Sequence, residues 1–326
     1  MAGTGLFDKG LPLLLAWLLA QETLHIAIGD RDALTDLALL YLTHQHFTAY
    51  VFAHVGQSNA VGFYRIGKLI QRHVVGFGNA ETKSEGQSVN YDNASEGFTA
   101  RYTHETIALG FALTEEAVED NLYDRLGARY TKALARSMAH TKQVKAANVL
   151  NNAFSSSFTG GDGVSLINTS HPLAGGGTLA NRQTTMADLN ETSLENALIS
   201  ISTFVDDRNM ILALQGTKLI VPPQLQFIAD RLLESPGRVG TSDNDINAVR
   251  NMGLLPQGYS VNHFLTDTDA FFILTDVPDG FKHFERTPIS TSMEGDFDTG
   301  NVRYKARERY SFGFSNPRCV FGSQGA

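Results

Sequence analysis

The residues best suited to catalysis lie in one glycine-rich stretch, where a Gly-Gly-Asp-Gly segment at 160–163 precedes Ser170, His171 and Pro172. A serine hydrolase needs a Gly-x-Ser-x-Gly elbow after a strand, and the chain has none. Residues 174–178 are glycine-rich but lack the Gly-Lys-Ser/Thr ending of a P-loop. We therefore interpret His171 as a hydrogen-bonded turn residue. The alternative is a hydrolase that uses His171 and a nearby serine.

Two acidic clusters offer oxygen ligands for a cation, at 243–245 (Asp-Asn-Asp) and 267–269 (Asp-Thr-Asp). Neither has the spacing, glycine and closing glutamate of an EF-hand. Helix capping and a hairpin turn explain these residues more simply. His44 and His46 are close in sequence, but no HExxH pattern or cysteine partner supports a zinc site. We predict no metal, no cofactor and no enzymatic activity.

The composition is that of a folded chain with more than one lobe. Its 326 residues exceed the size at which a single core stops growing. A net charge of -8 argues against direct wrapping of nucleic acid by this chain. The single cysteine, Cys319, allows no internal disulfide and fits a reducing cytoplasm. We interpret it as a small buried hydrophobic residue.

The first eighty residues follow no regular pattern. The apolar run 11–20 has about half the length that a membrane span needs, and its flanks are weak for a signal peptide. We predict a short amphipathic or buried arm segment there, and no membrane association. Residues 11–80 as a whole match neither the helical nor the strand period.

Residues 85–111 predict a β-hairpin. Polar and apolar residues alternate at 87–91, a turn-like patch follows at 92–97, and a long second strand runs from 98 to 111. The hairpin is polar on one side and has no core partner in the sequence. We therefore expect it to pack against another subunit.

A long amphipathic helix is predicted from Thr114 to Phe154. Thr114 can cap it, and Glu115 and Glu116 complement the helix dipole in the first turn. Apolar residues recur every four positions from Val118 onward, and the remaining positions are largely basic. Such a helix would be a rod of roughly 60 Å that serves as a spine. We interpret its basic face as solvated or paired with another subunit.

The rest of the chain mixes helices and strands in segregated order. We predict a helix after Asn190, a strand at 217–221 followed by a helix at 224–234, two strands at 259–264 and 270–275 joined by 266–269, and a last strand at 304–314. Segregated rather than alternating elements indicate an α+β fold.

Ten short motifs occur in a recognisable order along the chain, among them Gly-Phe-Thr-Ala-Arg-Tyr-Thr-His at 97–104 and Ser-His-Pro-Leu-Ala-Gly-Gly-Gly at 170–177. The others lie at 85–89, 119–123, 147–151, 159–163, 218–223, 244–248, 266–270 and 309–313. Together they resemble the major capsid proteins of tailed phages, in particular the Mu-like major head subunit family. Residues 11–80 depart from that pattern, because the polar arm with Tyr and Glu that it implies is not found there.

The resemblance implies the Hong Kong 97 capsid fold and its parts. These would be an N-terminal arm (1–55), an extended E-loop hairpin with flanks (56–105), a peripheral domain (106–185) with the spine helix 114–154, an axial domain (186–295) and a return strand (296–326). An encapsulin-like compartment shell of the same fold is the alternative.

The implied function is that of a major capsid (head) protein. It would assemble with itself into hexamers and pentamers of an icosahedral shell around double-stranded DNA, without sequence-specific binding. Implied partners are a separate scaffolding protein, a portal and, optionally, a decoration protein. The protein would reside in the virion after assembly in the host bacterial cytoplasm.

Some capsids of this fold crosslink their subunits by an isopeptide bond between lysine and asparagine, assisted by a buried glutamate. The positions that the resemblance implies here are Lys83, Asn301 and Glu308. The reaction needs a desolvated lysine and a glutamate with a raised pKa. Asn301 and Glu308 are seven residues apart, so a regular strand would place them on opposite faces, which argues against the reaction.

Overall fold

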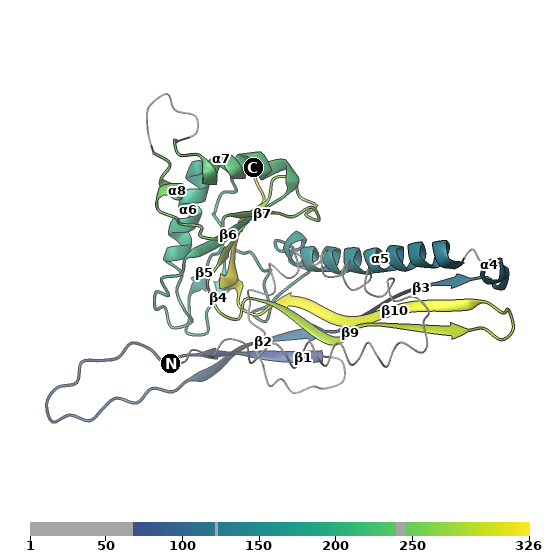
Figure 1. Ribbon diagram of the computed structural model, residues 1–326. Helices are drawn as coiled ribbons and strands as arrows, with labels where there is room; N and C mark the ends of the chain where they lie inside the picture. Colours follow the sequence, from purple (N-terminus) through teal and green to yellow (C-terminus); the bar gives the residue numbers. More distant parts are fainter. Residues whose placement is uncertain (1–67, 121–122, 239–245) are drawn as a thin grey trace, which may run out of the picture. The chain divides into compact units, whose positions relative to one another are not determined.

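A computed structural model describes residues 68–120, 123–238 and 246–326 (Figure 1). Four predictions fall outside these residues: the N-terminal arm 1–55, the apolar run 11–20, the pair His44 and His46, and the cluster 243–245. The described residues form two compact units. The smaller contains Leu109–Ala139 and Ser292–Ala306, and the larger contains the residues up to Ala108 together with His140–Thr291 and Arg307–Ala326.

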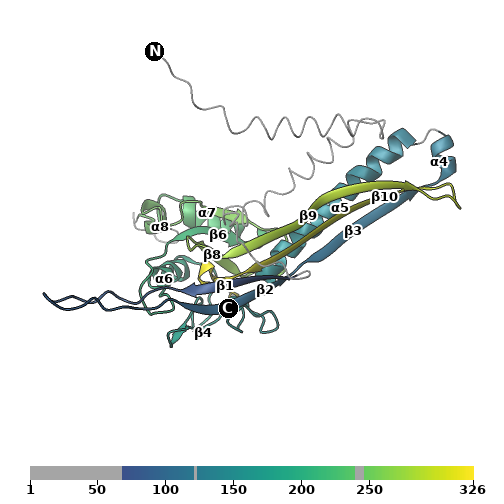
Figure 2. The same cartoon turned by 90° about the horizontal axis from the view of Figure 1, so that it is seen from below.

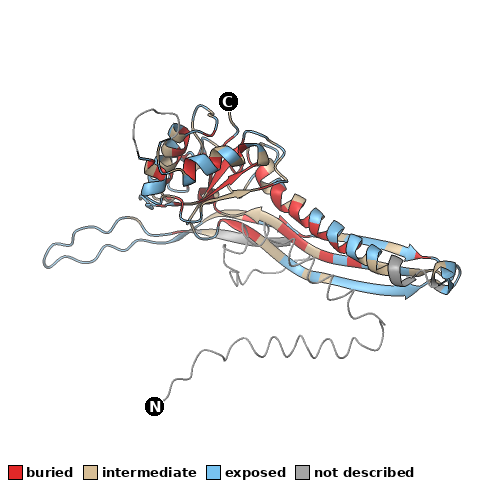
Figure 3. Ribbon diagram, turned by 45° about the horizontal axis from the view of Figure 1, so that its top comes forward, coloured by how far each residue is buried: buried red, intermediate tan, exposed pale blue. Residues whose placement is uncertain are grey.

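The predicted hairpin exists, but with different strands. β1 (Lys68–Val75) pairs antiparallel with β2 (Ser95–Thr103), and residues 76–94 between them are almost entirely exposed (Figure 3). The prediction of a strand at 87–91 is wrong, and the expected turn at 92–97 contains the start of β2. Alternation alone does not make a strand, because its backbone groups also need a partner to hydrogen-bond. The predicted partner of β2 was therefore placed too late in the chain.

The predicted second strand of the hairpin is divided at His104. β2 ends at Thr103, and β3 (Glu105–Leu113) belongs to a separate sheet with strand order β3-β10-β9. The other two strands of that sheet are β9 (Phe281–Gly295) and β10 (Val302–Phe314) (Figure 2). The last predicted strand is confirmed as β10, although the short strand β11 (Val320–Ser323) follows it.

The single helix predicted from Thr114 to Phe154 is corrected to two helices, α4 (Glu115–Glu119) and α5 (Tyr123–Asn151). Thr114 caps α4 as expected, since its Oγ1 accepts a hydrogen bond from the Ala117 amide at 3.4 Å. The end of α5 lies in a run of asparagines, where Asn152 Nδ2 donates to the Asn148 carbonyl at 2.8 Å. Side chains that compete in this way for backbone groups favour helix ends. At 29 residues, α5 is about 44 Å long.

Of the predicted apolar stripe of α5, Leu134, Met138 and Leu150 are buried, whereas Tyr130 is 43% exposed. In the smaller unit, α5 contacts the three-stranded sheet through the rings of Phe111 and Tyr130, whose centroids are 5.6 Å apart. In the larger unit its buried residues join a second core cluster with residues of β6, β8, β9 and β11. Helix α5 therefore packs against strands in each of the two units.

A four-stranded sheet with order β11-β8-β6-β7 forms the centre of the larger unit. β6 (Gly216–Val221) runs parallel to β7 (Tyr259–Val261) and antiparallel to β8 (Phe271–Thr275). The predicted strands are thus confirmed, but residues 266–269 do not form a hairpin turn. β7 and β8 lie on opposite sides of β6, so the connection between them crosses over that strand.

Helices α6 (Glu191–Ser202), α7 (Gln226–Glu234) and α8 (Ala248–Asn251) pack against this sheet. A short helix η1 (Pro223–Leu225) leads from β6 into α7, which confirms the predicted strand–turn–helix. Asn190 caps α6, and Ser193 completes a capping box. The main core cluster lies between these helices and the sheet, and includes Leu194, Ile201, Leu219, Phe271 and Phe321.

The remaining short elements are β4 (His171–Pro172), β5 (Thr178–Leu179) and η2 (Pro317–Cys319). Strands and helices are segregated along the chain, which confirms the α+β class. Cys319 is buried as expected, and burial raises the pKa of its thiol. Across the described residues, no helix combines the length and the hydrophobicity needed to cross a bilayer.

Candidate functional site

The end of the β1–β2 ladder next to segment 76–94 is attached to the loop that follows α6. His73 in β1 lies with Nε2 2.7 Å from Asp207 Oδ2. Arg208 Nη2 donates to the Asn93 carbonyl at 3.0 Å and lies 3.6 Å from Asp92 Oδ1. Asp207 and Arg208 therefore contact both chain segments at this end of the ladder. We call the side chains of His73, Asp92, Asp207, Arg208 and Arg318 the hairpin clamp.

Further contacts, with Arg318 and with the backbone of Gly175, fix the position of Asp207. Its Oδ1 lies 3.4 Å from Arg318 Nη2, and Arg318 Nε donates to the Val205 carbonyl at 2.7 Å. The Gly175 amide donates to the Asp207 carbonyl at 2.8 Å, and a Cβ at position 175 would come within 2.3 Å of that oxygen. Burial opposes ionisation of the Asp207 carboxyl, but the hydrogen bond with His73 and the charge of Arg318 outweigh it and lower its pKa.

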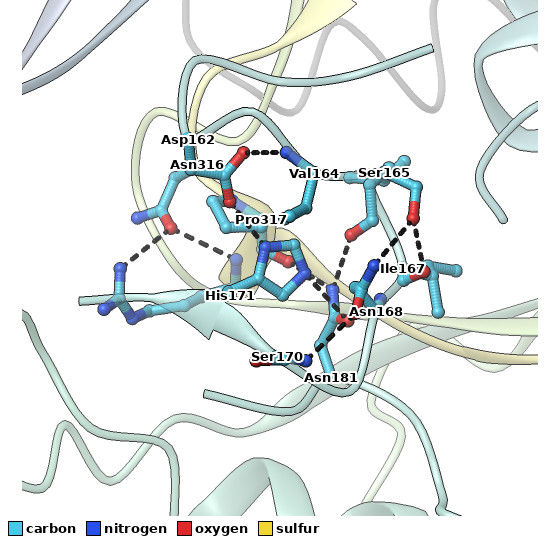
Figure 4. Close-up of polar contacts among 12 residues, drawn as sticks. Asp162, Val164, Ser165, Ile167, Asn168, Ser170, His171, Asn181, Asn316 and Pro317 are labelled. Carbon is cyan, nitrogen blue, oxygen red and sulfur yellow. Dashed lines mark hydrogen bonds and ion pairs between the residues drawn. The ribbon is translucent and has the colours of Figure 1, made fainter. Parts of the chain in front are cut away.

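A second histidine–aspartate pair lies close to the clamp, where His171 Nδ1 is 2.6 Å from Asp162 Oδ2 (Figure 4). Its other ring nitrogen is 3.2 Å from Asn181 Oδ1. Asn181 is oriented unambiguously, because its Nδ2 donates to three backbone carbonyls, those of Leu166, Pro317 and Val320. Both nitrogens of His171 are therefore engaged by neighbouring side chains.

The interpretation of His171 as a hydrogen-bonded residue is confirmed, although it lies in the short strand β4 and not in a turn. Its side chain is 1% exposed, and both nitrogens are engaged by Asp162 and Asn181. A general base must reach the proton that it removes, which this geometry prevents. The network instead joins the loop after α5 to the C-terminal segment of the chain.

One small cavity of about 20 Å³ is lined by both histidine–aspartate pairs and by Arg318. That volume suits about one water molecule and is far below that of a substrate pocket. The cavity is therefore too small to hold a substrate.

A buried ion pair connects α5 to the three-stranded sheet within the larger unit. Lys142 and Glu308 are 2% and 1% exposed, and Lys142 Nζ lies 3.5 Å from Glu308 Oε2. Glu285 Oε2 is 3.6 Å from the same ammonium, and the ring of Tyr310 is 5.2 Å from it. Burial and the charge of Lys142 lower the pKa of the nearby His283 to about 4.

Lys142 is a residue whose role the sequence interpretation missed, since it was assigned to the basic remainder of the helix. A signal was present. Lys142 follows Leu134 and Met138 at intervals of four and precedes Ala146 and Leu150 at the same interval. It therefore stands on the apolar stripe, where a lysine needs a buried partner.

The three candidate crosslinking residues lie in different surroundings. Lys83 is exposed in the segment between β1 and β2, and Glu308 is buried in β10 beside Lys142. Asn301 lies in the turn between β9 and β10, where its carbonyl accepts from the Asp296 amide at 2.8 Å. Lys83 and Glu308 belong to the larger unit and Asn301 to the smaller, so no single unit gathers the three. Within the subunit, Lys83 is not the desolvated lysine that the reaction requires.

The acidic cluster 267–269 is used in local structure. Asp267 Oδ1 accepts a hydrogen bond from the Asp269 amide at 3.1 Å, as in an Asx turn. Throughout the part of the chain that the structure describes, no three His, Cys, Asp or Glu side chains are grouped to hold a metal ion.

Comparison with known proteins gave a family and several similar structures. The sequence model of a family described as phage capsid protein matches residues 97–322. A search of curated proteins found no match. The solved capsid of Myoviridae phage XM1 is 10% identical, with 82% of this chain and 88% of that chain covered and a TM-score of 0.49.

Two further similar structures also share low sequence identity with this chain. The virus-like particle from Pyrococcus furiosus is 11% identical over 90% of this chain and 99% of that chain, with a TM-score of 0.46. The structure described as Mycobacterium phage Che8 is 15% identical over 80% of this chain and 86% of that chain, with a TM-score of 0.46.

Proposed function

The chain belongs to the phage capsid protein family and is a structural protein of a phage shell; from that premise we propose that it forms the hexamers and pentamers of an icosahedral head around double-stranded DNA. The expected resemblance to tailed-phage capsid proteins and the Hong Kong 97-type class are confirmed at the level of the family. Membership of the Mu-like branch stays a prediction.

The observation that carries the proposal is the exposed segment 76–94 of the hairpin. Phe77, Val89 and Tyr91 are 59%, 60% and 89% exposed, although each is a large apolar or aromatic side chain. Exposed apolar groups on an otherwise polar extension mark a contact surface. A neighbouring subunit that covered them would give the hairpin the core partner that its own subunit does not supply.

We assign this hairpin to the E-loop and α5 to the spine helix. The four-stranded sheet with α6, α7 and α8 would be the axial domain, and β10 would return to the peripheral domain. The boundaries at residues 55, 105, 185 and 295 stay predictions. Shells of this kind use heterologous contacts, which close only when the rotations match.

The wider setting follows from the same assignment. The protein is a virion component, and we place its assembly in the host bacterial cytoplasm. The scaffolding protein, the portal and the optional decoration protein would be its partners. The net charge of -8 supports enclosing the DNA rather than binding it in sequence-specific fashion. We assign it no catalytic activity.

Electron microscopy of the expressed full-length chain tests the proposal. We expect shells, tubes or capsomers, and DNA inside particles purified from infected cells. Absence of assemblies under all conditions would refute it, and particles filled with a protein cargo instead of DNA would identify the encapsulin-like alternative. Replacing Phe77, Val89 and Tyr91 together with serine should abolish assembly while circular dichroism and melting of the subunit are unchanged.

The isopeptide bond between Lys83 and Asn301, assisted by Glu308, stays a prediction. Neighbouring subunits would have to bury Lys83 in the assembled shell, since the isolated subunit leaves it exposed. Denaturing gel electrophoresis of mature particles decides the matter. Ladders of covalent oligomers that disappear in Lys83→Arg support the bond, and monomer bands alone exclude it.

A further inference from the structure

One end of the smaller unit is densely acidic. Residues 115–120, which include α4, and residues 293–303, around the turn between β9 and β10, contain seven carboxylates against one arginine, Arg303. We call these two segments the acidic tip (Figure 1). The carboxylate residues are Glu115, Glu116, Glu119, Asp120, Glu294, Asp296 and Asp298.

The two segments of the acidic tip are packed together. Gly300 has φ +68, and a Cβ there would come within 2.6 Å of Glu115 Cδ, so the helix and the turn are in direct contact. Asp296 Oδ2 accepts from Thr299 Oγ1 at 2.8 Å and pairs with Arg303. The turn is therefore organised by Asp296, and the other six carboxylate residues are exposed.

The tip also carries an apolar group at its end. Phe297 is 101% exposed and Met293 is 47% exposed. A fully exposed phenylalanine between Asp296 and Asp298 contributes nothing to the core of its own subunit. Its burial against a partner would remove its apolar surface from water and so favour association.

The same unit has a face of opposite charge on α5. From residue 125 to residue 139, where this unit ends, the chain contains four lysines and arginines and no acidic residue. Arg129 and Arg136 are exposed and lie seven residues apart, so they share one face of the helix. We call Arg129 and Arg136 the basic face.

We propose that the acidic tip of one copy docks on the basic face of α5 in a second copy. The proposal rests on the capsid function above, and it names the partner surface for an interface between subunits. The complementary charges and the exposed Phe297 are its grounds. Contacts between two different surfaces of identical chains are heterologous, as a closed shell requires.

A second copy fits these observations better than the other possible partners. DNA would be attracted to the basic face but repelled by the acidic tip. A second copy satisfies both surfaces at once, and carboxylates crowded together in one subunit are stabilised when cations approach them. Electrostatic complementarity of this kind also fixes the register and excludes wrong partners.

Charge reversal on each surface separately tests the proposal. The tip variant carries Glu294→Lys and Asp298→Lys, and the basic-face variant carries Arg129→Glu and Arg136→Glu. Each should slow shell formation about tenfold or more, since like charges would then face each other. The variant with all four changes restores opposite charges and should assemble within about threefold of the unmodified chain. Light scattering measures the rate and electron microscopy identifies the product.

Control measurements separate this proposal from the proposed function. Glu234→Lys reverses an exposed charge in α7 and should leave the rate unchanged. Circular dichroism and the melting temperature of each unassembled variant establish that it is folded. If the unmodified chain assembles but the tip variant assembles as fast, or if the folded fourfold variant is not rescued, the docking proposal is wrong and the capsid function stands. Normal shells from the basic-face variant that fail only to retain DNA would assign that face to DNA.

Discussion

His73 and Asp207 are 134 residues apart in the chain, yet His73 Nε2 and Asp207 Oδ2 meet at 2.7 Å where segment 76–94 leaves the β1–β2 ladder. The contact links a strand of the hairpin to the loop after α6. Arg318, close to the C-terminus, holds the same carboxylate from the other side. Strand β1, the loop after α6 and the C-terminal segment are distant in the sequence, and together they orient this hairpin.

Removing the imidazole of His73 should loosen the hairpin. We expect His73→Phe to lower the free energy of unfolding by about 1 kcal/mol, because it removes a hydrogen bond to a charged group that is partly exposed. Amide hydrogen exchange in β1 and β2 should increase more than this global change explains. His263→Phe, at an exposed histidine outside the clamp, is the matched control. Unchanged exchange in the hairpin would contradict the role of the clamp.

The Lys142–Glu308 pair should behave as a buried ion pair. Lys142→Met alone should cost about 3–5 kcal/mol, because it leaves the Glu308 carboxylate buried without its cation. Adding Glu308→Leu should recover most of that loss, since a hydrophobic pair of similar volume avoids desolvation. Urea unfolding of the unassembled subunit measures the double-mutant cycle. Additive losses would show that the two side chains do not depend on one another.

His283 gives the subunit a defined sensitivity to acid. Its pKa is about 4 in the folded protein, because of burial and the charge of Lys142, against 6.5 for an unperturbed histidine. Between these values the unfolded chain binds a proton that the folded chain does not, so stability falls as the pH decreases from about 6.5 to about 4. Across this window His283 lowers the free energy of unfolding by about 3 kcal/mol.

The variant His283→Phe isolates this contribution. It keeps an aromatic ring against Phe312, whose ring centroid lies 4.6 Å from that of His283, and it removes the titrating group. The difference in unfolding free energy between variant and unmodified protein should change across pH 4 to 6.5 and be constant above that window. A difference independent of pH would exclude His283 as the source.

Gly313 is a position where no side chain fits. A Cβ there would lie 2.4 Å from Cε1 of Tyr102, which is buried and hydrogen-bonded to Ser315 at 2.5 Å. We expect Gly313→Ala to destabilise the subunit by about 1–3 kcal/mol through overpacking. Gly295→Ala, also in a long strand but with no atom within 4 Å of the new Cβ, should have little effect. Equal melting temperatures for the two variants would contradict this account.

Local sequence patterns correctly predicted the elements whose ends are set by residues close to them in the sequence. Asn190 identified the start of α6, and the two prolines after Val221 marked the end of β6. These signals depend on neighbours in sequence, namely caps, turns and helical periodicity. The class and the family could also be anticipated, because ordered motifs extend over most of the chain.

Pairings between distant segments could not be predicted. The alternation at 87–91 indicated a strand, but the partner of β2 is β1, in a stretch without a clean period. β9 was missed because Pro288 and its polar residues obscure the strand pattern. The clamp and the Asp162–His171–Asn181 network join residues whose proximity only the tertiary fold creates.

The exposure of segment 76–94 affects how the sequence of such a protein can evolve. Its side chains are almost wholly exposed, so its sequence is constrained little by the folding of its own subunit. Selection on these residues then acts through whichever neighbour they contact. Mutations there can alter the lattice while the clamped scaffold beneath keeps its stability.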